Sequence, residues 1–213
     1  MNYTHVIWDF NGTILDDMAI GVECVNLMLS KRGLRTVDGI EEYRRLFRFP
    51  IIDYYRLAGF DFERDDYYTV LAPEWIGLYT ERMGRCGLCP EAADTLGRIF
   101  EAGLSQVVLS ATERGQLMGQ LNDLGVCHWF DEVLGLDNIH AHSKAELAVQ
   151  WQKRHPGAVP LFVGDTEHDA ETARAIGADC VLYTGGHQAK ERLSACGFPL
   201  IHRLSDIWPY IKT

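Results

Sequence analysis

The sequence predicts an α/β protein, in which a parallel sheet has helices on both faces and an all-helical segment follows the first strand. Two observations lead to this prediction. From about Cys86 onward, continuous apolar runs alternate with helical patterns, which is typical of parallel sheets buried on both faces. Between Asp17 and Arg85, by contrast, the apolar residues recur only at helical spacing.

The N-terminal half contains one strand and several helices. The apolar run from His5 to Trp8 predicts a buried strand. Apolar residues from Ile20 to Met28 recur every three to four positions, which predicts a helix that ends at Gly33. Turn signals at 49–50 and 59–61 separate three further predicted helices, at 40–47, 51–58 and 65–83. We expect no strand in this segment.

The C-terminal half begins with a predicted helix from Glu91 to Ala102, which Pro90 can start and Gly103 can stop. Strands are expected at 105–109, 132–136, 161–163 and 180–183, and helices at 113–124, 144–154 and 170–176. We therefore expect an α/β core made of residues 1–16 and 86–213, and a helical cap domain made of residues 17–85.

Composition excludes some classes of function. The chain has 213 residues and a formal net charge of -10, which argues against binding nucleic acid or an anionic membrane surface. No apolar run reaches the roughly 18 residues of a membrane helix, and no signal-type segment opens the chain. We expect a cytoplasmic protein, either a monomer or a homodimer, whose six cysteines are free thiols.

Two short patterns could indicate a metal or redox site. Cys86 and Cys89 have the spacing of such motifs, but no second pair accompanies them. His140 and His142 alternate in an expected loop without a third ligand at helical spacing. Structural thiols and loop histidines near an active site are the simpler interpretations.

Polar residues follow or flank the predicted strands at four places. These are Asp9, Ser110, Lys144 and the run from Gly164 to Asp169, which reads Gly-Asp-Thr-Glu-His-Asp. Ligands bind at the carboxyl ends of the strands in open parallel sheets, so these positions are candidate site residues. Each position taken alone is also compatible with ordinary turn or helix-capping chemistry.

Together, the four positions resemble the four motifs of the haloacid dehalogenase-like hydrolases, which are an Asp-rich strand end, a Ser or Thr, a Lys or Arg, and an acidic Gly-Asp-Thr-x-x-Asp. Asp9-Phe10-Asn11-Gly12-Thr13 is similar to the first motif, Asp-x-Asp-Gly-Thr. A helical insertion between the first and second motifs resembles the C1-type cap of phosphoglycolate phosphatase-like members. The resemblance implies a Rossmann-like core and a phosphatase that uses Mg2+.

The resemblance also implies roles for individual residues. Asp9 would be the nucleophile that forms an aspartyl-phosphate, which splits the transfer into two easier steps. The metal ligands would be Asp9, Asp165, the main-chain oxygen of Asn11 and, mostly through water, Asp169. Lys144, Ser110, Thr13 and the Ala111 amide would bind the phosphate, and stabilise the charge on its oxygens. Arg48, which follows a predicted cap helix, is our candidate for substrate specificity, and a solvated basic face formed by Arg44, Arg45 and Arg48 is the alternative.

Asn11 is the main departure from the family pattern. Phosphatases of this family have at this position an aspartate that acts as general acid and base. An amide cannot carry a proton between pH 4 and 10, and general acid–base catalysis contributes roughly 10²–10⁴-fold. We therefore expect slow hydrolysis, or a preference for acyl or aryl phosphates, whose leaving groups need no proton. Asp16 or Asp17, the latter in place of the usual Ser or Thr, could substitute through a water molecule.

The function predicted from the sequence is a Mg2+-dependent phosphatase that acts on a small phosphorylated metabolite. The alternative from a different class is a weakly catalytic or non-catalytic protein that binds a phosphate ligand. A 2-haloacid dehalogenase is less well supported, because Asp165 and Asp169 form an acidic site that expulsion of halide does not need. A phosphonatase would need a cap lysine, and Lys31 is the only lysine in the expected cap.

Overall fold

The computed structural model describes residues 3–136 and 143–211. Its main feature is a six-stranded parallel sheet in the order β5-β4-β1-β6-β7-β8. The first strand lies inside the sheet, with Trp8 paired to Val108 on one side and to Val163 on the other. The strands are β1 (His5–Trp8), β4 (Ser105–Glu113), β5 (Glu132–Leu136), β6 (Pro160–Gly164), β7 (Asp179–Tyr183) and β8 (Leu200–Ile201).

Helices cover both faces of the sheet, as the sequence predicts. One face packs on α5 (Ala92–Glu101), α6 (Arg114–Asp123) and the C-terminal turns η4 (Leu204–Ile207) and α10 (Trp208–Ile211). The other face packs on α7 (Lys144–Arg154), α8 (Glu167–Ala175) and α9 (Lys190–Ala195). Because both faces are buried, the strands consist of continuous apolar runs rather than alternating ones.

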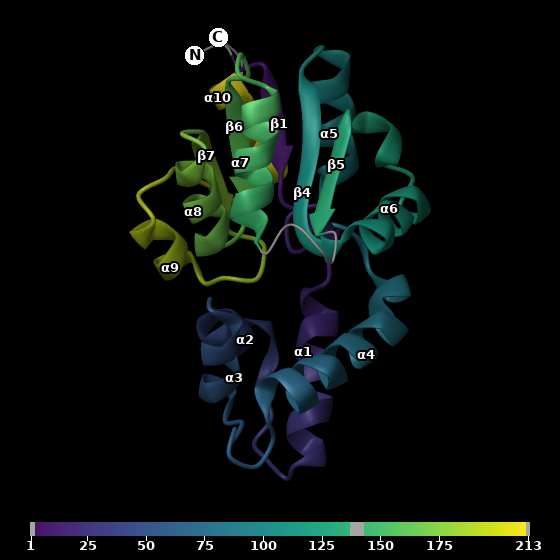
Figure 1. Ribbon diagram of the computed structural model, residues 1–213, viewed down its shortest axis with the longest axis vertical. Helices are drawn as coiled ribbons and strands as arrows, with labels where there is room; N and C mark the ends of the chain where they lie inside the picture. Colours follow the sequence, from purple (N-terminus) through teal and green to yellow (C-terminus); the bar gives the residue numbers. More distant parts are fainter. Residues whose placement is uncertain (1–2, 137–142, 212–213) are drawn as a thin grey trace.

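The segment after the first strand is helical and contains no strand between residues 17 and 85. It lies beyond the carboxyl ends of the sheet strands (Figure 1). We call α1 to η2 the helical insertion. Its elements are α1 (Met18–Lys31), α2 (Gly39–Leu46), α3 (Ile51–Ala58), the π-helical turn η1 (Tyr67–Leu71), α4 (Ala72–Arg82) and the 3₁₀ turn η2 (Met83–Arg85).

The helical insertion has its own apolar core. Val25, Met28 and Leu29 of α1 pack with aromatic residues of α2 and α3, among them Tyr43 and Tyr55. Around this core, the buried Arg32 guanidinium bonds to Asp65 at 2.9 Å and to Glu74 at 2.7 Å. The insertion therefore has an apolar core of its own, with partly buried charge pairs at its edge.

Several short elements were missed by the sequence analysis. A two-stranded antiparallel ribbon pairs β2 (Leu15–Asp16) with β3 (Gly87–Leu88), and it joins the two ends of the helical insertion. Strands of two residues carry no detectable periodicity, which also explains why β8 was not predicted. The 3₁₀ turn η3 (Cys127–Trp129) was likewise missed.

Some element boundaries also differ from the predictions. β4 continues to Glu113 through an irregular register after Leu109, so α6 begins at Arg114 rather than at Glu113. The capping box of Thr166 and Asp169 starts α8 at Glu167, three residues earlier than expected. All six cysteines are free. In the described part of the chain, no helix is long and apolar enough to cross a membrane.

A glutamine holds three elements together inside the core. Gln106 of β4 has 0% exposed surface. Its side-chain oxygen accepts a hydrogen bond from the Trp8 indole at 3.1 Å. Its amide nitrogen donates to the carbonyls of Leu96, at 2.9 Å, and Trp129, at 3.2 Å. The strand register therefore depends on a polar group that is satisfied only in this arrangement.

Replacing this glutamine should destabilise the protein strongly. Gln106→Leu would leave the Trp8 indole buried without an acceptor and would remove one donor from each of the two carbonyls, so we expect the free energy of unfolding to fall by about 3 kcal/mol. Chemical denaturation measures this change. The matched control is Gln150→Leu, on the exposed side of α7, which should have little effect. An equal effect of the two substitutions would contradict this account of Gln106.

Candidate active site

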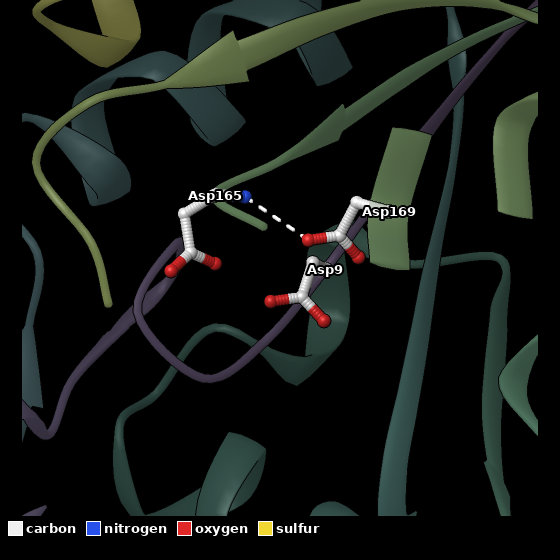
Figure 2. Close-up of side chains that lie close together, drawn as sticks. All are labelled: Asp9, Asp165 and Asp169. Atoms are coloured by element: carbon white, nitrogen blue, oxygen red, sulfur yellow. Dashed lines mark hydrogen bonds between the residues drawn. The ribbon is translucent and has the colours of Figure 1, made fainter. Parts of the chain in front are cut away.

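Three aspartates converge where the carboxyl ends of β1 and β6 meet. Asp9 follows β1, Asp165 follows β6 and Asp169 lies in the first turn of α8. One carboxylate oxygen from each lies within 4.8 Å of the others. Figure 2 shows the three side chains around a common space, with the Asp165 amide donating to Asp169 at 3.1 Å. All three side chains are buried, as expected for parallel strands that end at one edge.

Lys144 supplies the positive charge of this cluster. It is the first residue of α7, and its ammonium group bonds to Asp9 Oδ1 and, at 2.5 Å, to Asp169 Oδ1. Burial alone would lower the pKa of Lys144, but Asp169 and Asp9 outweigh burial and raise this pKa above its usual value. The lysine therefore stays charged although its side chain is 3% exposed.

Further hydrogen bonds fix the other two carboxylates. Asp169 Oδ2 accepts hydrogen bonds from the Thr166 amide at 2.9 Å and the Thr166 hydroxyl at 2.7 Å. Asp165 accepts from the Thr13 hydroxyl at 2.9 Å and from the His187 amide at 2.6 Å. A Cβ atom at Gly186 would lie 2.2 Å from Asp165 Oδ2, so only glycine allows this close approach.

The donor set fits a hard divalent cation. Three carboxylates face one space, and Lys144 contacts two of them, Asp9 and Asp169. The excess negative charge shows in the pKa values. Burial and the Asp169 carboxylate raise the pKa of Asp9 despite Lys144, and burial raises the pKa of Asp165. A metal ion bound by oxygen ligands alone would relieve this repulsion.

Among the described residues, the cysteines and histidines form no comparable cluster, and His140 and His142 lie outside the described residues.

Asn11 makes four hydrogen bonds that use both ends of its amide. Its nitrogen donates to Asp17 Oδ2 at 2.8 Å and to the Tyr79 hydroxyl at 3.0 Å. Its oxygen accepts from the Thr112 hydroxyl at 3.0 Å and the Ser110 hydroxyl at 3.5 Å. A carboxylate at position 11 would place an oxygen, instead of a donor, against the Asp17 carboxylate. The asparagine is therefore matched to the aspartate at position 17.

Asp17 forms the centre of a second buried network. Its carboxylate accepts from the Gly12 amide at 3.1 Å and from the Tyr79 hydroxyl at 2.8 Å, and it pairs with His187 Nε2 at 2.9 Å. The other ring nitrogen of His187 bonds to the Tyr43 hydroxyl at 2.9 Å. Asp17 thus joins the core to both α2 and α4 of the helical insertion.

The pair of Asp17 and His187 is held in its charged form. Burial would raise the pKa of Asp17, but His187 and the donors Asn11 and Tyr79 outweigh burial and lower it. Burial would likewise lower the pKa of His187, but Asp17 outweighs burial and raises this pKa from 6.5 to about 9. The imidazolium therefore balances a carboxylate that Lys144 does not contact.

A cavity of about 550 Å³ lies between the core and the helical insertion. Most of the predicted site residues line it, namely Asp9, Asn11, Ser110, Ala111, Lys144 and Asp169. Asp165 and Thr13 are completely buried, do not line the cavity and bond to each other. Thr13 therefore orients Asp165 in this arrangement, rather than contacting a substrate as we expected.

The prediction for Arg48 is not supported by the structure. Its guanidinium donates to the carbonyls of Leu46 and Arg45, both at 3.3 Å, because α2 ends just before it and leaves these carbonyls free. Arg48 does not line the cavity. Arg44 does not line the cavity either, and its guanidinium donates to the Gly185 and Gly186 carbonyls at 2.6 and 2.8 Å. It holds the helical insertion against the loop after β7.

His187 was not predicted from the sequence, and neither was the choice between Asp16 and Asp17 as the acid near Asn11. Asp17 lines the cavity, whereas Asp16 is exposed in β2 and does not. The sequence does carry a signal for His187, because Gly185 and Gly186 lie one residue beyond the predicted strand at 180–183. Asp9 was selected because it follows a strand of a parallel sheet, and the same criterion applies to the loop that follows the strand at 180–183.

The fold and this arrangement of residues agree with the comparison to known families. The model of the haloacid dehalogenase-like hydrolase family matches residues 6–183. The chain belongs to this family. The phosphoglycolate phosphatase of Synechococcus elongatus is 27% identical over an alignment of 215 residues that covers 95% of this chain and 94% of that protein. The phosphoglycolate phosphatase of Pseudomonas putida is 25% identical over 85% of this chain and 70% of its own length.

Solved structures share the fold at lower sequence identity. The Mycobacterium tuberculosis Protein Tyrosine Kinase A aligns with a TM-score of 0.81 and 16% identity, over 100% of this chain and 99% of that one. A predicted phosphatase from Clostridium acetobutylicum aligns with a TM-score of 0.80 and 17% identity over 99% of both chains. At such identities, the likeness concerns the fold alone.

The match between positions 11 and 17 can be tested by a double-mutant cycle. Asn11→Asp should lower the free energy of unfolding by about 2 kcal/mol, because it buries two carboxylates in contact. In a background of Asp17→Ser, the same substitution should cost much less. Chemical denaturation of the four proteins gives the coupling energy. Additive effects of the two changes would show that the two side chains do not interact as described.

The charged histidine predicts how stability depends on pH. The pKa of His187 is about 9 in the folded protein, against an ordinary value of 6.5, so its contribution to stability is complete below pH 6.5. It should be lost as the pH rises toward 9, by roughly 3 kcal/mol. Urea unfolding between pH 6 and 9 with chelator measures this loss. His187→Gln should flatten the profile, and His202→Gln, at an exposed position, should not. A profile unchanged by His187→Gln would contradict the assignment.

Proposed function

We propose that the protein is a Mg2+-dependent phosphatase that acts on a small phosphorylated compound through an aspartyl-phosphate at Asp9. The observation that carries this proposal is the position of Asp9 at the cavity. One of its oxygens is held by Lys144, and the other accepts, from the described part of the chain, only a long contact of 3.5 Å from the Thr13 hydroxyl. A carboxylate oriented in this way is suited to nucleophilic attack.

The surrounding residues supply the electrostatics that phosphoryl transfer requires. Lys144 and the Ser110 hydroxyl lie at the cavity, where they can donate to the phosphoryl oxygens as charge spreads over them. Mg2+, held by Asp9, Asp165 and the main-chain oxygen of Asn11, with Asp169 acting mostly through water, would neutralise phosphoryl charge. The Ala111 amide is a further candidate donor to the phosphate.

Asn11 limits the rate of this reaction. Its amide has no proton to give to a departing oxygen and cannot activate a water molecule as a base. We therefore propose slow turnover on alkyl phosphates, with the lost factor of roughly 10²–10⁴ typical of general acid–base catalysis. The same amide retains the hydrogen bonds that support the site, so binding of the metal and of phosphate should persist.

The relatives support the phosphatase class and the architecture. Two curated relatives are phosphoglycolate phosphatases, and the polar cluster of this chain lies under a helical insertion, with the order of motifs that we identified. The free cysteines support a cytoplasmic location. These points favour a phosphoglycolate phosphatase-like enzyme, and the side chains that line the cavity bear on its substrate.

A phosphate-ligand binding protein is the second candidate, and Asn11 is the observation that favours it. A dehalogenase is disfavoured by the buried acidic cluster. A phosphonatase is disfavoured by the position of Lys31, whose ammonium pairs with Glu74 at 2.8 Å and whose side chain is 70% exposed. Lys31 does not line the cavity.

Removing the nucleophile should abolish hydrolysis. Asp9→Asn should lower kcat for acetyl phosphate by at least about 10³-fold, because the covalent route is lost. Phosphate release is measured with Mg2+ and with chelator. The matched control is Asp94→Asn, at an exposed position of α5, which should retain full activity. Metal-dependent activity that survives Asp9→Asn would contradict the mechanism, and an inactive wild-type protein that still binds phosphate would favour the binding protein.

A further inference from the structure

The cavity has two walls of different chemistry. The core contributes carboxylates, hydroxyls and the ammonium group around Asp9. The helical insertion contributes aromatic rings, which are those of Tyr43, Phe47, Phe49, Tyr55, Tyr67, Trp75 and Tyr79. Several of these rings already make face contacts with other rings. Phe47 stacks on His187 with ring centroids 5.0 Å apart, and Trp75 stacks on Tyr79 at 4.8 Å.

The charges at the cavity disfavour a substrate with a second anionic group. Of the described residues that line the cavity, Lys144 alone is a lysine or arginine, and Asp9 and Asp169 already bind its ammonium. His187 and His168 also line the cavity, but their ring nitrogens already lie 2.9 Å from Asp17 and 3.5 Å from Glu171. Asp17 and Glu113 add further carboxylates to the lining. Residues 137–142 contain neither lysine nor arginine. A carboxylate on the substrate would therefore meet repulsion rather than a partner.

Asn11 places a separate demand on the leaving group. Without a proton donor at this position, the departing oxygen must leave as an anion. A phenol, with a pKa of about 10 like that of tyrosine, leaves in this form far more readily than an alcohol, which holds its proton about as tightly as water, with a pKa of roughly 16. Acyl phosphates meet this demand as well, but they offer no ring to an aromatic wall.

We infer that the substrate is an aryl phosphomonoester, with its phosphate at Asp9 and its ring against the aromatic wall of the helical insertion. This inference rests on the proposed phosphatase function and names the class of its substrate. Aromatic rings in contact gain about 0.5–1.5 kcal/mol beyond the area that they bury. The wall therefore recognises the leaving group, and Asn11 selects among phosphates by the acidity of that group.

The reaction balances without a general acid. The free oxygen of Asp9 forms a bond to phosphorus while the bond from phosphorus to the aryl oxygen breaks. The electron pair leaves with the aryloxide, which takes a proton from solvent. Water then attacks phosphorus, the bond to Asp9 breaks, and the carboxylate is restored. One proton of the water stays on the phosphate and the other passes to solvent.

Four compounds distinguish recognition of an aromatic ring from the requirement for a good leaving group. Phenyl phosphate has both the ring and the good leaving group, benzyl phosphate has the ring alone, acetyl phosphate has the leaving group alone, and 2-phosphoglycolate has neither and carries a carboxylate. For the wild-type protein with Mg2+, kcat/KM for phenyl phosphate should exceed the values for benzyl phosphate and 2-phosphoglycolate by about 100-fold.

Substitutions in the wall test recognition of the ring. Trp75→Leu should lower kcat/KM for phenyl phosphate about tenfold and leave acetyl phosphate unchanged. Phe49→Leu gives a second test with a smaller packing change, should Trp75→Leu fail to fold. The matched control is Tyr68→Leu, because Tyr68 is 74% exposed and does not line the cavity. This control should leave both substrates unchanged.

The possible outcomes distinguish this inference from the proposed function. Hydrolysis of acetyl phosphate or 2-phosphoglycolate without hydrolysis of phenyl phosphate would overturn the aryl substrate and leave the phosphatase standing. Equal losses on phenyl and acetyl phosphate in both wall variants would also overturn it. An absence of hydrolysis of all four compounds would overturn both proposals. A loss specific to phenyl phosphate, together with the preference over benzyl phosphate, would support the inference.

Discussion

The structure of the site depends on one buried positive charge. The Lys144 ammonium lies between Asp9 and Asp169, and both carboxylates are withdrawn from solvent. Removing one partner from such a buried pair typically costs about 3–5 kcal/mol, because the remaining charge is left uncompensated. The positions of β1, α7 and α8 around this point are therefore linked by electrostatics as well as by the apolar core. The same lysine that stabilises the cluster also faces the cavity where a phosphoryl group would bind.

A second charge pair links the core to the helical insertion. Asp17 and His187 are both buried, and the hydroxyls of Tyr43 and Tyr79 bring α2 and α4 to them. Asn11 donates to the same carboxylate. The family pattern that the first motif resembles has an acid at position 11, whereas this chain has an amide there and its carboxylate at position 17, on the other side of the contact. The Asp17 carboxylate helps to hold the helical insertion, and position 11, close to the nucleophile Asp9, has no acid that could carry a proton.

The two walls of the cavity separate chemistry from recognition. The sheet edge presents the groups that can attack and stabilise a phosphoryl group, and the helical insertion presents rings. Lids commonly exclude water and select the substrate while the scaffold holds the reacting groups. The basic residues of α2 contribute to this arrangement indirectly, since Arg44 binds the loop after β7 instead of a ligand.

The sequence by itself determined the fold class and the main polar cluster. Continuous apolar runs are local signals, and parallel strands bring their carboxyl ends to one edge, which groups Asp9 with the run from Gly164 to Asp169. The pairing of Lys144 with Asp9 was implied by the resemblance to the haloacid dehalogenase-like motifs. The two-residue strands escaped prediction because they have no period. Only the tertiary structure paired Asp17 with His187, which lie 170 residues apart, and turned Arg48 toward its own helix end. Such contacts depend on how separate elements pack, and the spacing of residues along the chain does not encode that packing.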